Sequence, residues 1–223
     1  MSKQPILHPA VVRLTHWTWA LGVILLIMSG MRIYNQEPVF ENDWYFPLWL
    51  TLGVSYADTN KLHNDFGLAA ALLWHFFAMW LLFVSLIVFL VYAIVSGHFR
   101  KYWPVTPREV LGNIADFLRG KLGHDIGTRN AVQKLLYAFA LFAMIVMVLS
   151  GLVLWKPVQF HTLGLVMGQY EGARYLHFFG MCAIILFLVV HIALTLMVPK
   201  VLPPMITGRA PVEGAVHAPG EAS

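Results

Sequence analysis

The chain has 223 residues, of which 59% are hydrophobic and only 12% are charged. Soluble domains are about a quarter charged, so this composition excludes an ordinary soluble enzyme and indicates an integral membrane protein. The formal net charge of +4 is concentrated in loops and does not argue for a nucleic-acid partner.

Four apolar runs follow one another along the chain, and each is long enough to cross a bilayer core of about 30 Å as a helix. The predicted fold class is therefore all-α, an integral membrane four-helix bundle. Residues 34–74 form the first loop, in which residues 63–74 are expected to be interfacial or short helical pieces. Residues 207–223 are rich in Ala, Pro and Gly and predict a flexible tail. The runs are residues 14–33, 75–97, 132–155 and 176–198.

Loop charges predict the orientation of these spans. Residues 34–62 carry four acidic side chains and one lysine, whereas residues 98–131 carry six basic and three acidic side chains. Basic loops stay on the cytoplasmic side, so both termini are expected in the cytoplasm of a bacterium. The first run lacks a small-residue cleavage site and predicts an uncleaved span of the inner membrane, surrounded by lipid.

Two histidines lie 14 residues apart in the fourth apolar run, His177 and His191. Fourteen residues advance a helix by roughly 21 Å and return to within about 40° of the same face. Ionisable side chains inside a membrane span usually have a function, and imidazole is a good ligand for iron. The spacing predicts two metal centres stacked across the membrane.

Depth along the spans suggests a partner for each of these histidines. His16 lies at the inner end of the first span, level with His191. His75 and His177 each lie 22 residues before the inner end of their own spans, so they share a depth near the outer side. His63 would lie ~18 Å farther out on a continuous helix. It nevertheless competes with His75, because the sequence after it also resembles a helix start.

Histidine pairs on facing helices can supply both axial positions of a haem b in a helix bundle. Gly22, Gly30, Gly151 and Gly180 leave room for a flat macrocycle. No Asp, Glu or Cys joins either pair, which disfavours zinc. Two other functions remain open: a transporter or metal-handling protein that uses histidines, and a membrane anchor without redox activity.

The segments around these histidines resemble the bacterial cytochrome b561/Ni-hydrogenase cytochrome b family over residues 8–209. The resemblance implies two bis-histidine haems b, with His16 paired to His191 and His75 to His177. It also implies electron exchange between the quinone pool and a partner redox protein on the outer face. Suggested partners are a molybdopterin oxidoreductase, a hydrogenase-like subunit or a cytochrome. The matching segments include Arg13-Leu14-Thr15-His16-Trp17, Trp74-His75-Phe76-Phe77 and Arg174-Tyr175-Leu176-His177.

Three arginines at span ends, Arg13, Arg100 and Arg174, are candidate partners for haem propionates, because a guanidinium binds a carboxylate as a fork. Ordinary interfacial anchoring is the competing interpretation for each of them. The quinone is expected near the inner histidine pair, where Asn113 and His98 are the candidate contacts. No catalytic residue is predicted.

Overall fold

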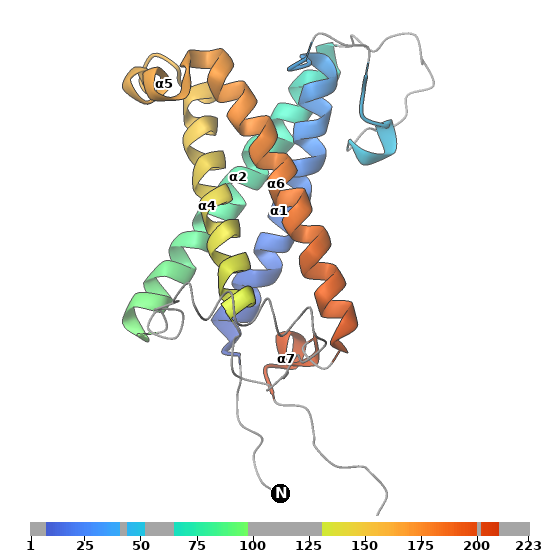
Figure 1. Ribbon diagram of the computed structural model, residues 1–223, viewed down its shortest axis with the longest axis vertical. Helices are drawn as coiled ribbons and strands as arrows, with labels where there is room; N and C mark the ends of the chain where they lie inside the picture. The colour runs from blue at the N-terminus through green and yellow to red at the C-terminus, as the bar shows by residue number, and fades with distance from the viewer. Residues whose placement is uncertain (1–7, 41–43, 52–64, 98–130, 200–201, 210–223) are drawn as a thin grey trace, which may run out of the picture.

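A computed structural model describes residues 8–40, 44–51, 65–97, 131–199 and 202–209, and the elements in these ranges are helices (Figure 1). Four of them are long, and they confirm the predicted all-α membrane bundle. In chain order the elements are α1 (Ala10–Gln36), η1 (Leu48–Leu50), α2 (Asp65–Val95), α4 (Ala131–Trp155), α5 (His161–Met167), α6 (Gln169–Met197) and α7 (Leu202–Thr207).

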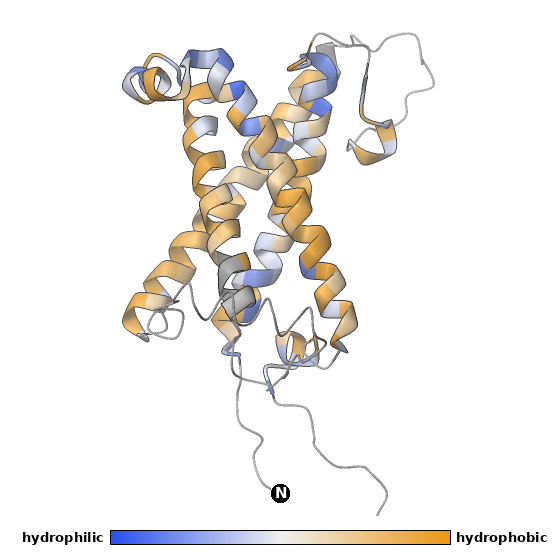
Figure 2. Ribbon diagram, in the orientation of Figure 1, coloured by the Kyte–Doolittle hydropathy of each residue, from blue (hydrophilic) through white to orange (hydrophobic). Residues whose placement is uncertain are grey.

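The helices α1, α2, α4 and α6 are each long and apolar enough to cross a membrane. Large apolar side chains cover their outward faces; Leu73 and Val95, for example, are 73% and 83% exposed. Such contiguous apolar surface would be unfavourable in water and is suited to contact with lipid tails. Hydrophobic residues dominate these four helices in Figure 2, whereas hydrophilic residues gather mainly near their ends.

The boundaries differ from prediction at α2. Residues 65–74, expected to be separate pieces of the first loop, are continuous with the second span in one helix that starts at Asp65. The segment from Leu68 to Leu73 consists of alanine and leucine, two strong helix formers, and no proline interrupts it. The apolar part of this helix accordingly begins at Leu68 and not at residue 75.

Two helix pairs make up the bundle. α1 packs along α2, and α4 packs along α6, whereas contacts between the two pairs are sparse. Glycine permits the close approach within each pair. A Cβ on Gly22 of α1 would lie 3.6 Å from Leu82 Cβ of α2, and a Cβ on Gly180 of α6 would lie 2.6 Å from Met147 Sδ of α4. Both glycines, expected to make room for a macrocycle, thus serve helix packing.

The start of α1 and the short helix α7, which are the first and last described helices, lie at the same end of the bundle, which we call the terminal end (Figure 1). There the Trp17 indole nitrogen donates to the Met205 carbonyl at 3.1 Å, and the backbone nitrogen of His8 donates to the Gly208 carbonyl at 3.3 Å. Residues 207–209, predicted to begin the flexible tail, take part in these contacts, because the Gly208 carbonyl is one of the two acceptors. Residues 210–223 lie outside the described ranges. The opposite end, which carries α5, is called the α5 end.

Candidate functional site

The four predicted histidines come together as two pairs, each bridging the two halves of the bundle. At the α5 end, the rings of His75 on α2 and His177 on α6 have centres 6.2 Å apart. At the terminal end, the rings of His16 on α1 and His191 on α6 are also 6.2 Å apart. His63 lies outside the described residues, so its competition with His75 is not tested.

A separation of 6.2 Å between ring centres is too long for direct contact but suits a shared metal ion. A ligating imidazole nitrogen lies ~2.0 Å from a transition metal and ~1.1 Å from its own ring centre, so trans ligands have centres ~6.3 Å apart. Among the described residues, no group of three or more His, Cys, Asp or Glu side chains could hold a metal. Two protein ligands per site fit a haem, whose porphyrin supplies the other four positions.

Serine hydroxyls hold the two imidazoles at the α5 end. Ser29 Oγ lies 2.9 Å from His75 Nδ1, and Ser150 Oγ lies 3.0 Å from His177 Nδ1. Each hydroxyl also donates to the carbonyl four residues earlier in its own helix, at 2.6 Å and 2.7 Å respectively. Because the hydroxyl proton is used there, the serine oxygen accepts the Nδ1 proton. Nε2 is then left as the ligand nitrogen, the usual arrangement at metal-binding histidines.

A glycine follows each of these serines and makes room for the adjacent ring. A Cβ on Gly151 would lie 3.3 Å from His177 Cε1, and a Cβ on Gly30 would lie 3.7 Å from His75 Cε1. Sequence reasoning identified these two glycines but missed the serines beside them. The available signal was the same Ser-Gly dipeptide inside both the first and the third span.

The histidine pair at the terminal end has aromatic neighbours instead. The His191 ring stacks on Phe187, with centres 5.5 Å apart and planes 19° apart. The His16 ring meets Trp17 edge-on, with a centre separation of 5.4 Å. Within the described ranges, no side chain forms a hydrogen bond to a ring nitrogen of His16 or His191.

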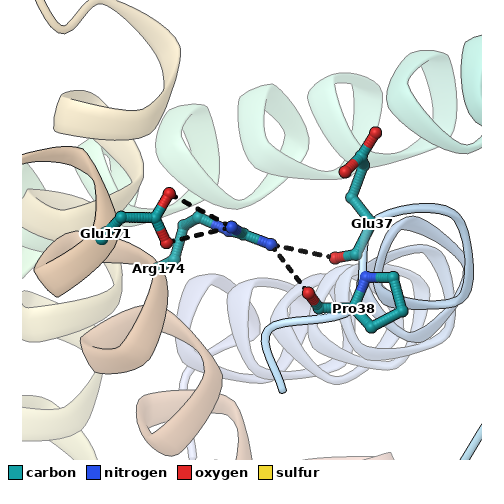
Figure 3. A network of polar contacts seen from close by, with 4 residues as sticks. All are labelled: Glu37, Pro38, Glu171 and Arg174. Atoms are coloured by element: carbon teal, nitrogen blue, oxygen red, sulfur yellow. Dashed lines mark hydrogen bonds and ion pairs between the residues drawn. The ribbon is translucent and has the colours of Figure 1, made fainter. Parts of the chain in front are cut away.

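The two described candidate arginines hold neighbouring chain segments together. Arg174 binds the Glu171 carboxylate at 3.0 and 3.3 Å and donates to the carbonyls of Glu37 and Pro38 at 3.2 and 3.0 Å (Figure 3). Arg13 donates to the Ile206 carbonyl, and its Nε is buried without a partner among the described residues. Arg100, His98 and Asn113 lie outside the described residues. Propionate binding by these arginines therefore stays a prediction.

One buried polar atom near the α5-end pair was not anticipated from the sequence. Tyr34 is only 4% exposed, and its hydroxyl has no hydrogen-bond partner in the described part of the chain. Tyr34 lies one turn beyond Gly30 on α1, so it shares the helix face that meets His75. A buried hydroxyl without a partner suits a polar edge of a bound molecule, such as a haem propionate. The histidines, the glycines and this hydroxyl together fit haem b.

Comparison with known proteins agrees with this geometry. A family model described as prokaryotic cytochrome b561 matches residues 7–208. The chain is also similar to a protein of Azospira oryzae named putative protein-methionine-sulfoxide reductase subunit YedZ1. The two are 43% identical over 212 residues, which cover 94% of this chain and 100% of that protein. No solved structure matches the chain.

Proposed function

We propose that this chain links the quinone pool to a partner redox enzyme through two bis-histidine haems. The chain belongs to the prokaryotic cytochrome b561 family and is a membrane-bound haem b electron-transfer subunit. The observation that carries this proposal is the pair of equal ring separations, 6.2 Å at each end of the bundle. One haem is held by His75 and His177, the other by His16 and His191.

The bundle's own side chains explain why this arrangement suits electron transfer. Bound haem b supplies an iron that takes up and releases one electron. A histidine from each of two helices would hold each haem, which would favour electron transfer over binding of a substrate at the iron. Because His177 and His191 lie 14 residues apart on α6, the two sites are separated by roughly 21 Å along a bilayer core of about 30 Å.

The direction across the membrane follows from loop charge. The basic segment 98–131 is expected on the cytoplasmic side of the bacterial inner membrane, and both termini with it. The terminal end is then the cytoplasmic end, where His16 and His191 lie. His75 and His177 then lie toward the outer face of the membrane, where the partner enzyme would bind.

The partner is proposed from the relative's name and from chemistry. The Azospira oryzae protein is named as a subunit of a protein-methionine-sulfoxide reductase. Reduction of a methionine sulfoxide consumes two electrons and two protons and yields a thioether and water. A quinol releases two electrons and two protons. Electrons would therefore pass from quinol to a catalytic subunit at the outer face, which we propose to be a molybdopterin oxidoreductase.

Haem content tests the assignment. The full chain, made with ample haem and purified in detergent, should show reduced b-type bands and about two haems per chain. His177→Ala should remove the haem of the α5 end, and His191→Ala should remove the haem of the terminal end. A colourless chain would exclude the proposal and favour either the histidine-based transporter or the non-redox anchor. A coloured chain that keeps its full haem content in both variants would place the ligands elsewhere.

A further inference from the structure

A short segment at the α5 end, residues 44–51, lies outside the four long helices. It contains η1 and packs beside the end of α1, and Figure 1 shows η1 (light blue) turned back along the bundle from that end. The segment carries no charged side chain. Four of its large side chains are exposed, Trp44 by 53%, Tyr45 by 39%, Leu48 by 43% and Trp49 by 77%. An exposed aromatic surface of this kind marks contact with something other than water.

Hydrogen bonds and ring contacts hold the segment at a fixed place beside the last turn of α1. The Asn35 side-chain nitrogen donates to the Phe46 carbonyl, and the Asn35 side-chain oxygen accepts the Phe46 backbone N–H, both at 2.8 Å. Asn35 is only 6% exposed. The Tyr34 ring lies against Trp44 and Phe46, with centres 6.1 and 5.3 Å apart. The depth of the segment in the membrane therefore follows from the depth of residues 34 and 35.

The charges of α1 locate these two residues relative to the bilayer. Residues 14–31 contain no Asp, Glu, Lys or Arg, and Arg13 and Arg32 flank them. An uncharged helical stretch of this length extends ~27 Å, close to the hydrocarbon core of about 30 Å. Tyr34 and Asn35 follow Arg32 within one helical turn. They lie where the acyl chains end and the headgroups begin, and the segment that they hold lies there too.

The backbone of the segment suits a place with little water. Pro47 has no N–H group, and its carbonyl accepts the Leu50 N–H at 2.9 Å. The Leu48 carbonyl accepts both the backbone N–H and the hydroxyl of Thr51, at 3.1 and 3.0 Å. Together with the two bonds between Asn35 and Phe46, these contacts pair backbone groups that would otherwise need water. Such partial pairing fits the headgroup region, where water is scarce but present.

We propose that residues 44–51 form a membrane-interface anchor, in which Tyr45, Leu48 and Trp49 contact lipid at the boundary between the headgroups and the acyl chains at the α5 end. Trp and Tyr favour this boundary because each combines an apolar ring with a polar group. The anchor continues the lipid-facing surface of the spans and keeps the end of α1 at a constant height. Because the segment is uncharged, the contact should not select anionic lipid. The anchor is independent of the haem and quinone assignments.

The depth of a spin label tests the anchor in the full chain reconstituted in nanodiscs. Cys182→Ser removes the single cysteine, and labels are then attached one at a time at Trp49→Cys, Glu37→Cys and Leu73→Cys. The Trp49 label should collide with oxygen more often than with a water-soluble nickel chelate, at a depth of about 5–10 Å. Its depth should be the same in phosphatidylethanolamine with or without phosphatidylglycerol. Leu73, 73% exposed on α2, is the lipid-facing control, and Glu37, exposed just after α1, is the water-facing control.

Releasing the segment from α1 gives a second readout. Asn35→Ala removes both hydrogen bonds to Phe46, so the Trp49 label should become more mobile and spread over several depths. The Leu73 label and the circular dichroism of the helices should not change. A Trp49 label as accessible to nickel as the Glu37 label would place the segment in water and overturn the anchor. A label shielded from both reagents would place the segment against protein, such as a second copy of the chain, and would also overturn it.

Discussion

The two histidine pairs have the same ring separation but are held in different ways. At the α5 end, hydroxyls of Ser29 and Ser150 bind the Nδ1 atoms of His75 and His177. At the terminal end, His191 stacks on Phe187 instead. Equal ligand spacing can thus be combined with unequal surroundings. The surroundings tune a bound metal, so the two sites are expected to differ in reduction potential while sharing one ligand type.

The largest expected effect separates the competing ligands of the α5 end. His75→Ala should remove one of the two haems, because it deletes a ligand that lies opposite His177. His63→Ala should retain both haems. Haem per chain, measured as the pyridine haemochrome, distinguishes these outcomes. Loss of a haem in His63→Ala alone would show that the depth argument for His75 is wrong.

A smaller but still large effect is expected from filling the space beside His177. Gly151→Val introduces a Cβ about 3.3 Å from the imidazole carbon, and its methyl groups would displace the ring. The α5 end should lose about half of its haem or more, whereas the haem at the terminal end should be retained. Equal loss from both ends would show that the bundle had unfolded, and circular dichroism of the helices serves as the control.

Removing the serine hydroxyls should change potentials without removing haem. Ser29→Ala or Ser150→Ala deletes an acceptor for the Nδ1 proton, which makes the imidazole a weaker electron donor to ferric iron. The reduction potential of the haem at the α5 end should rise by roughly 20–60 mV, which corresponds to the loss of one hydrogen bond. Redox titration followed in the visible spectrum measures both haems at once.

The control for these serine variants is Ser96→Ala, whose hydroxyl bonds a carbonyl of α2 outside the histidine sites. The conservative changes Ser29→Thr and Ser150→Thr keep a hydroxyl and should restore the original potential. If both potentials moved together, or neither moved, the serines would have only a packing role.

The smallest effect concerns the hydrogen bonds that join α1 to the segment 202–209 at the terminal end. Trp17→Phe removes the hydrogen bond to the Met205 carbonyl but keeps an aromatic ring beside His16. The melting temperature should fall by about 2–4 °C, the shift expected for ~1 kcal/mol in a chain of this size. The potential of the α5-end haem should not change. A shift at that haem would mean that the two ends are coupled through α6.

Features that depend on one segment alone were predictable. Span number follows from apolar runs, since lipid offers no hydrogen bonds to an unfolded backbone and helices must satisfy their own. Depth follows from counting residues at ~1.5 Å each, which is why the pairs His75 with His177 and His16 with His191 were anticipated. The start of α2 at Asp65 was not anticipated: residues 68–74 are apolar enough to belong to the span, but residues 63–74 were assigned to the loop before it.

Features that depend on which helix faces meet were decided by the tertiary structure. Ser29 and His75 lie on different helices, as do Ser150 and His177, so their hydrogen bonds require a particular rotation of each helix about its axis. The hydrogen bonds that join residues 202–209 to the start of α1 likewise depend on packing between segments. Sequence by itself determined how deep each side chain lies, because helical rise is constant. Packing determined its neighbours, because rotation is set only by contact with another helix.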